Sequence, residues 1–239
     1  MVMGTLGSAG YFMGDNRLAP RDTNPKGFFE DSEVNHINEE LIAQHLKPPI
    51  PILGKWLRRD LRNGQRWLAT LPNDLEFHLT AGLQTRITAV TARTPYCYKD
   101  PRFCYTLPVW EPFLEDTGFI CVFREPLATA RSILKECRRN RRLENVRMTL
   151  RRAVDIWVAM YEHVLSHRGD GADWLFVHYD DVLTGDGVAK LAEFTQATVD
   201  HTFPDPRLKR SESKGSVPRQ ATSLYDKLCQ LAEYTEDKL

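Results

Sequence analysis

An arginine and a serine lie eight residues apart just beyond a short apolar run of the sequence. The run FICVF (119–123) ends at Arg124, Pro126 opens an amphipathic segment, and Ser132 follows about two helical turns later. An arginine suits a phosphate or sulfate, and the amides of a helix N-terminus favour the same anion. The Ser132 hydroxyl would bond a phosphate lying along the helix. A solvated arginine and an ordinary helix serine are the alternative, which these residues alone do not exclude.

Two more apolar runs end in polar or charged residues. PYCYK (95–99) ends in Lys99 and is followed by Arg102, while WLFVHY (174–179) is followed by two aspartates. In an open α/β sheet, ligands bind beyond the carboxyl ends of the strands. Lys99 and Arg102 would make this edge cationic, which suits phosphate or sulfate. The alternative for the two residues is a structural ion pair with Asp100.

The elements that must position these residues are three strands and several helices. The three apolar runs are the predicted strands, and their alternation with helical segments indicates a parallel sheet with helices on both faces. Asp31 or Ser32 is a suitable N-cap for the helix that follows. The predicted helical segments are 1–13 (with a flexible end as the alternative), 32–42, 54–71 with a break near Asn63, about 80–91, about 127–168 with a basic break near 138–142, about 186–197 and 218–236.

Composition and charge restrict the class of protein. The chain has 239 residues, 42% of them hydrophobic, and a formal net charge of zero. This length suits a single domain, 1–239, and zero net charge provides no global attraction to nucleic acid or membranes. The five cysteines contain no CxxC pair, which favours reduced thiols and argues against a zinc site. No apolar run approaches the roughly 18–20 residues that span a bilayer. We therefore expect a soluble, cytoplasmic protein.

Five segments occur in the order in which a known family carries them. They are NPKGFFEDSEVNHIN, YKDPRFCYTLPVWEPFL, FREPLATARS, FVHYDDVL and RLKRSESKGSVPRQATSLYDKL. Together they resemble bacterial sulfotransferases, and the resemblance covers nearly the whole chain. It implies a three-layer sandwich with a central parallel sheet of the P-loop-NTPase type. It also implies transfer of a sulfuryl group from 3′-phosphoadenosine 5′-phosphosulfate (PAPS) to a hydroxyl or amine of a glycan or small-molecule acceptor.

The resemblance implies which residues would hold the donor. Arg124 and Ser132 would bind its 3′-phosphate. Lys209 and Arg210 would lie in a loop that folds over it, with a plain solvated loop as the alternative. The transfer needs no metal, because cationic side chains stabilise the charge of an in-line displacement.

The resemblance also implies which residues would act on the transferred group. Lys99 would stabilise the sulfuryl oxygens, and Arg102 would assist or orient Lys99. Glu30, in GFFED, would be the general base that takes the proton of the acceptor. The alternative for Glu30 is a carboxylate that stabilises the start of a helix.

One feature of the family is not found in the sequence. Sulfotransferases carry a strand and a loop ending in Ser-Gly-Thr that holds the 5′-phosphosulfate, whereas MVMGTLGSAGYFMGDN (1–16) aligns best with the helix after that loop. GTLGSAG (4–10) is an alternative phosphate cradle, but no apolar strand precedes it and it contains no Lys or Arg. We therefore expect the N-terminal strand of the fold to be missing, its neighbours to be unpaired, and sulfuryl transfer to be weak or absent.

Two other classes of function remain open. The segment KECRRNRRLENVRMTLRR (135–152) has eight basic and two acidic residues, so it predicts phosphate contacts with nucleic acid or another polyanion. It lacks interleaved aromatic residues, and with the balanced total charge this argues against nucleic acid as the main partner. A solvated helix face, or an edge that guides an anionic acceptor, explains the same run. The other class is a noncatalytic scaffold of the same fold.

Overall fold

The sheet of this protein consists of two parallel strands in the part of the chain that the computed structural model describes, residues 1–20, 26–46, 61–168, 173–208 and 215–235. Strand β1 (Phe119–Phe123) pairs with β2 (Trp174–His178), with Phe119 opposite Trp174 and Phe123 opposite His178. Both strands were predicted from their apolar runs, and both predictions are confirmed. Only Tyr179 differs, because it begins the next helix instead of ending the strand.

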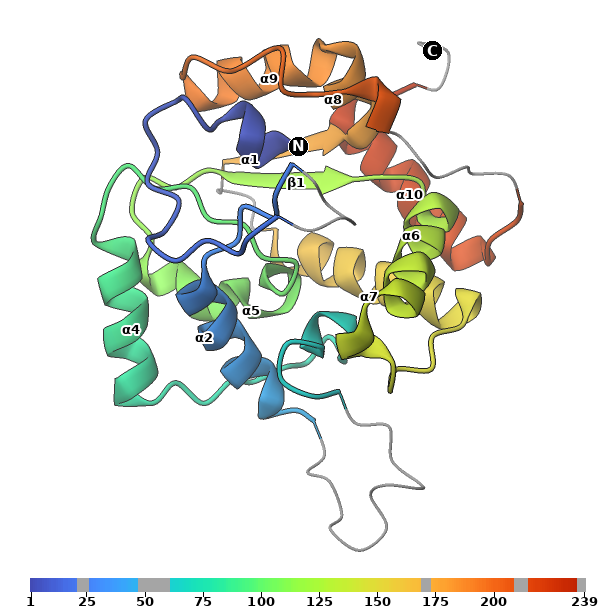
Figure 1. Cartoon of the computed structure of the whole chain (residues 1–239), viewed down its shortest axis with the longest axis horizontal. Helices are drawn as coiled ribbons and strands as arrows, with labels where there is room; N and C mark the ends of the chain where they lie inside the picture. The colour runs from blue at the N-terminus through green and yellow to red at the C-terminus, as the bar shows by residue number, and fades with distance from the viewer. Residues whose placement is uncertain (21–25, 47–60, 169–172, 209–214, 236–239) are drawn as a thin grey trace, which may run out of the picture.

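Helices surround the two strands (Figure 1). They are α1 (Val2–Thr5), α2 (Ser32–Ala43), α4 (Ala81–Thr91), α5 (Phe103–Trp110), α6 (Pro126–Arg139), α7 (Leu150–His167), α8 (Tyr179–Thr184), α9 (Asp186–Thr195) and α10 (Arg219–Ala232), with 3₁₀ turns η1 (Arg66–Leu68), η2 (Glu111–Phe113), η3 (Arg141–Leu143) and η4 (Pro206–Leu208). The predicted α/β class is confirmed. The sheet of the described residues is narrower than the central sheet that the family resemblance implies, and the P-loop-type sandwich stays a prediction.

Both faces of the sheet are covered, as adjacent residues of β2 show. Val177 belongs to an apolar cluster with Val182 of α8 and Val188 of α9. Phe176 belongs to a second cluster, which includes Trp157 of α7. Adjacent residues of a strand point to opposite faces, so the two clusters cover the two sides of the sheet. Figure 1 accordingly shows α8 and α9 above the strands and α5 and α7 below them.

The prediction of a strand at PYCYK (95–99) is wrong. The segment makes one parallel bridge, in which the Phe12 N–H donates to the Pro95 carbonyl at 2.8 Å and the Cys97 N–H donates to the Phe12 carbonyl at 2.9 Å. This bridge provides hydrogen-bond partners for the backbone groups on one side of the segment only. On its other side no strand of the described chain is paired with it, so the extended backbone does not become part of a ladder.

The N-terminal helix is much shorter than the predicted 1–13. Helix α1 has four residues, and the chain then turns, with Gly10 at a φ of +83°. Gly4 packs closely against another part of the chain, because an added Cβ would lie 2.0 Å from an atom of the Phe203 ring. The glycine thus serves packing between α1 and a distant loop, and no long helix follows it.

The other helices differ from prediction mainly at their ends. Asp31 caps α2, its Oδ1 accepting from the Glu33 N–H at 2.8 Å and the Val34 N–H at 3.2 Å. The basic break near 138–142 is confirmed, because η3 separates α6 from α7. The predicted helix 54–71 is wrong in its described part, which contains only η1, and residues 54–60 lie outside the described residues.

Candidate functional site

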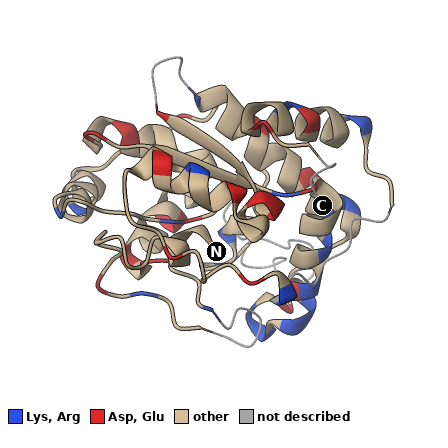
Figure 2. Cartoon of the chain, turned by 90° about the horizontal axis from the view of Figure 1, so that it is seen from above, with Lys and Arg blue, Asp and Glu red and all other residues tan. Residues whose placement is uncertain are grey.

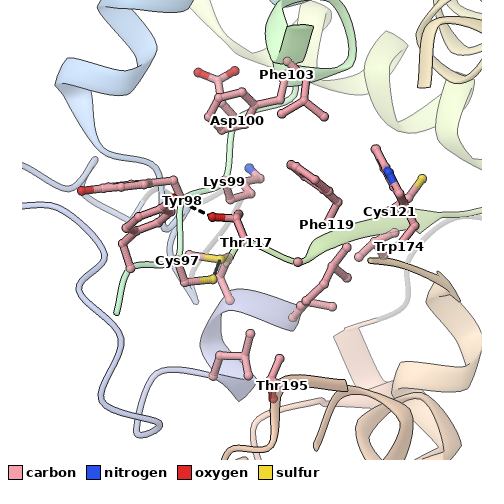
Figure 3. A pocket seen from close by; sticks show the side chains of 18 of the residues that line it. Cys97, Tyr98, Lys99, Asp100, Phe103, Thr117, Phe119, Cys121, Trp174 and Thr195 are labelled. Atoms are coloured by element: carbon pink, nitrogen blue, oxygen red, sulfur yellow. Dashed lines mark hydrogen bonds between the residues drawn. The ribbon is translucent and has the colours of Figure 1, made fainter. Parts of the chain in front are cut away.

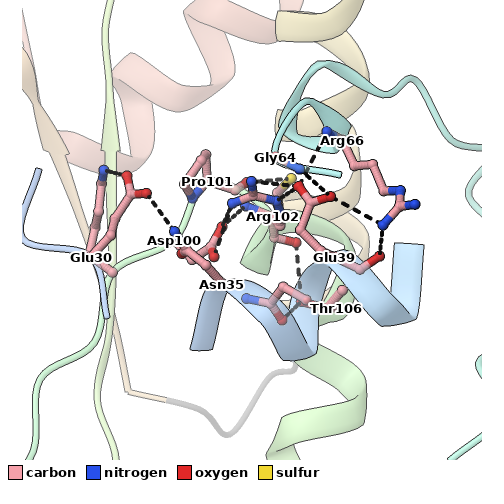
Figure 4. A network of polar contacts seen from close by, with 12 residues as sticks. Glu30, Asn35, Glu39, Gly64, Arg66, Asp100, Pro101, Arg102 and Thr106 are labelled. Carbon is pink, nitrogen blue, oxygen red and sulfur yellow. Dashed lines mark hydrogen bonds and ion pairs between the residues drawn. The ribbon is translucent and has the colours of Figure 1, made fainter. Parts of the chain in front are cut away.

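Glu30 and Lys99 form an ion pair, although 69 positions separate them in the sequence. The lysine ammonium donates to Oε1 of the glutamate, and its side chain is 44% exposed, whereas that of the glutamate is 10% exposed. The other carboxylate oxygen, Oε2, accepts from Nδ2 of Asn35 at 3.2 Å (Figure 4). The two residues assigned to the base and to the sulfuryl oxygens are therefore in direct contact.

The backbone around Glu30 explains why its carboxylate points toward Lys99. The N–H of Leu18 donates to the Glu30 carbonyl at 2.9 Å, which fixes the residue just before α2. Asp31 supplies the capping carboxylate of that helix. Glu30 is thus not needed as the cap, and its carboxylate is held between an amide and an ammonium group.

Arg102 lies between two buried carboxylates (Figure 4). Its Nη1 is 2.9 Å from Oδ1 of Asp100, and its Nε is 2.7 Å from Oε1 of Glu39. Burial raises the pKa of Asp100, an effect that Arg102 opposes. The structural ion pair with Asp100, which was the alternative interpretation of Arg102, is present. With a side chain only 5% exposed, Arg102 holds the turn after Lys99 in place and is not available to a ligand in this arrangement.

Glu39 is a structurally important residue that the sequence did not reveal. Besides Arg102, its Oε2 accepts from the Gly64 N–H at 2.9 Å and from Nη1 of Arg66 at 3.3 Å. These partners come from two parts of the chain that are distant from Glu39 in the sequence, residues 64–66 and Arg102. In the sequence, Glu39 is only a glutamate beside the apolar face of a predicted helix, and glutamate side chains at such positions are usually exposed to solvent.

Arg124 and Tyr179 occupy neighbouring strand ends, as expected for parallel strands. Because Phe123 pairs with His178, the residues that follow them are adjacent. The Arg124 guanidinium lies over the Tyr179 ring, 4.9 Å from its centroid. Burial raises the pKa of the Tyr179 hydroxyl, and Arg124 opposes that rise. The Arg124 carbonyl accepts from Nε1 of Trp157 at 3.1 Å, which anchors this strand end to α7.

The start of α6 differs from the expected anion site. Pro126 is the first residue of the helix, as predicted, but the Glu125 carboxylate accepts from the Leu127 N–H at 3.0 Å and from the Ala128 N–H at 2.6 Å. The helix N-terminus thus binds a carboxylate of its own chain. Ser132 is exposed and lies roughly 9 Å along the helix from Pro126. A phosphate at the start of this helix would have to displace Glu125 to reach the amides, and binding of its charge by Arg124 and Ser132 stays a prediction.

A cavity of about 1330 Å³ extends from Lys99 along β1 (Figure 3). Its lining includes Tyr179, the residue that Arg124 covers, so the cavity connects the Lys99 region to the carboxyl end of the sheet. Lys209 and Arg210, the predicted loop residues, lie outside the described residues. Among the residues that the structure places, no group of three or more His, Cys, Asp or Glu side chains is arranged to hold a metal ion. No helix in the described ranges is long and apolar enough to cross a membrane.

Comparison of the chain with protein-family models, with curated proteins and with solved structures finds no match. Membership of the sulfotransferase family stays a prediction that rests on the five ordered segments. The site is defined by its own geometry. The Lys99 ammonium and the Glu30 carboxylate are in contact beside a large cavity, and Arg124 lies at the carboxyl end of β1.

Proposed function

We propose that the protein binds PAPS and transfers its sulfuryl group to a hydroxyl or amine of a glycan or small-molecule acceptor. The contact between Glu30 and Lys99 beside the cavity carries this proposal. General-base catalysis needs a carboxylate within hydrogen-bond reach of the acceptor, and sulfuryl transfer needs a cation close to the moving group. The pair supplies both groups at one place.

The two side chains would act on different reactants: Glu30 on the acceptor, and Lys99 on the sulfuryl group that is transferred. Glu30 accepts the proton of the acceptor hydroxyl as the oxygen–sulfur bond forms and the bond from sulfur to the 5′-phosphate oxygen breaks. Lys99 turns from Glu30 to the sulfuryl oxygens, where its ammonium stabilises their charge. Asn35 keeps the Glu30 carboxylate in place through its 3.2 Å hydrogen bond when Lys99 leaves. The products are the sulfated acceptor and adenosine 3′,5′-bisphosphate.

Binding of the donor product tests the proposal without requiring turnover. Calorimetric titration with adenosine 3′,5′-bisphosphate should give saturable binding, and Arg124→Ala should weaken it about 10- to 100-fold, as expected when a charged hydrogen-bonding partner is lost. Adenosine 5′-monophosphate, which has no 3′-phosphate, should bind more weakly and with the same affinity to both proteins.

Arg93→Ala is a suitable control, because Arg93 is 57% exposed and pairs with Asp15 at 2.9 Å on the surface. It should bind the bisphosphate like the unmodified chain. A folded protein that does not bind the bisphosphate would contradict the proposal and favour the noncatalytic scaffold.

A second candidate function is binding of an anionic polymer through the basic segment. Arg138, Arg139, Arg141 and Arg142 are exposed where α6, η3 and α7 meet, and none of them is in an ion pair with a described residue. In Figure 2 the blue Lys and Arg segments gather at the lower right of the molecule. Phosphate or sulfate groups of a polymer would displace counterions there, so binding would fall steeply with salt.

Heparin chromatography distinguishes the two candidates. Substituting glutamate for these four arginines should remove salt-sensitive retention if the polymer is the main partner, while Arg124→Ala should leave the elution salt concentration unchanged. The opposite result, retention that depends on Arg124, would assign the anion affinity to the strand-end site.

A further inference from the structure

Phe29, the residue directly before Glu30, has a backbone conformation that is unusual for an aromatic residue. Its φ is +53°, in the left-handed region that asparagine enters more readily and that bulky residues rarely adopt. Strained conformations of this kind persist only where the surrounding structure holds them, and they cluster at functional sites. The contacts on either side of Phe29 therefore bear on the position of Glu30.

The backbone that follows Phe29 is fixed by hydrogen bonds to an earlier loop. The Leu18 N–H donates to the Glu30 carbonyl at 2.9 Å. Two positions further on, the Ser32 N–H donates to the Asn16 carbonyl at 2.9 Å. The chain from Glu30 to the start of α2 is thus held in place on one side of Phe29.

The backbone that precedes Phe29, and the Phe29 ring itself, are held by Phe203. The Lys26 ammonium donates to the Phe203 carbonyl and lies 4.6 Å from the centroid of its ring. The same ring meets the Phe29 ring edge to face, with the centroids 5.7 Å apart and the planes at 78°. The loop that carries Phe203 is anchored to α1, because the Asp200 N–H donates to the Thr5 carbonyl at 2.8 Å.

Phe29 is consequently a joint between two fixed pieces of backbone. A change of its φ to the ordinary negative range would rotate the chain after it relative to the chain before it. Glu30 comes directly after the joint, whereas its partner Lys99 belongs to a distant segment that this rotation does not move. The contact between the two side chains therefore depends on the conformation of Phe29.

We propose that Phe29 is a positioning residue for Glu30. Its left-handed backbone, which the Phe203 ring holds, directs the Glu30 carboxylate onto the Lys99 ammonium. Phe29 acts through Glu30 and takes no part in the chemistry itself. Glu30 is a base only in the transfer proposed above, so the catalytic consequence rests on that proposed function, whereas the contact between Glu30 and Lys99 can be measured without turnover.

Carbodiimide cross-linking measures that contact in the full chain. The reagent joins the Glu30 carboxylate to the Lys99 amine as an amide, which peptide mass spectrometry detects, and takes up the water that is lost. Glu30→Gln has no carboxylate at this position and gives the background. The yield of this one amide, relative to the unmodified chain, reports how often the two side chains meet.

Two substitutions of Phe29 remove the same ring but differ in the backbone conformation that they favour. Phe29→Asn suits a positive φ, so at least half of the cross-link yield should remain. Phe29→Val has a branched Cβ that is disfavoured there, and its yield should fall about 5- to 30-fold. Circular dichroism establishes that each variant is folded.

Phe203→Ala examines the holding ring, and it keeps the test valid if Phe29→Val does not fold. In the unmodified chain it should lower the yield about 5- to 30-fold, because the strain at Phe29 is no longer offset. In the Phe29→Asn background it should have little effect, since asparagine needs no ring to stay at a positive φ. Phe77→Ala is the matched control: the Phe77 ring makes an edge-to-face contact with His45, at 4.8 Å between centroids, and its loss should leave the yield unchanged.

Sulfuryl transfer separates the positioning role from the proposed function. Where Glu30→Gln lowers kcat, Phe29→Val should lower it as well, with KM for the donor unchanged, and Phe29→Asn should retain it. Equal cross-link yields in Phe29→Asn and Phe29→Val would overturn the proposal, as would a Phe203→Ala effect of the same size in both backgrounds. The expected cross-link pattern in a chain without transfer that depends on Glu30 would support the positioning of Glu30 and contradict the proposed function.

Discussion

The ammonium group of Lys99 donates to the carboxylate of Glu30, and Asn35 bonds the other oxygen of that carboxylate at 3.2 Å. The lysine is the more exposed partner, at 44% against 10% for the glutamate. An exposed cation can turn to a ligand at little cost, whereas the carboxylate stays fixed. This asymmetry suits a pair in which Lys99 follows the transferred group and Glu30 receives a proton.

Glu30→Gln should lower sulfuryl transfer about 10²- to 10⁴-fold, the usual contribution of a general base. The amide keeps the shape of the side chain, so adenosine 3′,5′-bisphosphate should bind unchanged. Transfer is measured with radiolabelled donor and binding by calorimetry. If Glu30→Gln loses bisphosphate binding in the same proportion as transfer, the residue supports the site instead of acting as the base.

Arg102→Met should destabilise the fold by about 3–5 kcal/mol, because the change leaves Asp100 and Glu39 as buried carboxylates without their shared cation. Urea unfolding measures the loss. Arg86→Met is the matched control: Arg86 pairs with Glu33 at 2.6 Å, but both side chains are at least a third exposed, so the cost should stay under about 1 kcal/mol. Equal losses in the two variants would contradict the structural role of Arg102.

The elements predicted best are those whose conformation is determined by their own residues. FICVF (119–123) is apolar throughout, which suits a strand buried on both faces, and Asp31 can cap α2 with its own side chain. PYCYK (95–99) has a similar composition but forms no strand. A strand requires a neighbour with matching backbone groups, and among the residues that the structure describes only Phe12 provides one. Composition cannot reveal whether that neighbour is present.

In the candidate site, too, some contacts could be predicted from local sequence and others depend on residues that are distant in the chain. Adjacency of Arg124 and Tyr179 follows from two predicted parallel strands, so it could be expected from the sequence. Contact between Glu30 and Lys99 could not, because no local rule joins residues 69 positions apart. The start of α6 at Pro126 was predicted, so the N-cap position of Glu125 could be expected, but only the structure shows that its carboxylate turns back onto the amides of Leu127 and Ala128.

Gly4→Ala should destabilise the fold by about 1–3 kcal/mol through overpacking, since the new Cβ would lie 2.0 Å from an atom of the Phe203 ring. Gly82→Ala, inside α4, is the matched control. Its nearest neighbour would be 3.9 Å away, and removing a helix glycine should stabilise the fold by about 0.5–1 kcal/mol. Thermal unfolding gives both values. A neutral Gly4→Ala would show that the loop carrying Phe203 moves aside freely.

His163 and His167 lie one turn apart on α7 with their rings tilted at 43° to each other, and their protonation should lower stability below neutral pH. Nε2 of His163 lies 3.1 Å from the Leu71 carbonyl, which can only accept, so this nitrogen carries the proton and Nδ1 faces Nε2 of His167 at 3.4 Å. Burial lowers the pKa of both histidines below the ordinary 6.5. The unfolded chain therefore takes up protons first as the pH falls.

The free energy of unfolding should consequently be highest above pH 6.5 and decrease as the pH falls through the lowered pKa values of the pair. His167→Gln should reduce the slope between pH 7 and pH 5, because it removes one group whose pKa changes on unfolding. His36→Gln, at an exposed position of α2, serves as the control and should leave the slope unchanged. Urea titrations across this range measure all three proteins, and a slope that His36→Gln reduces as much as His167→Gln would contradict the assignment to α7.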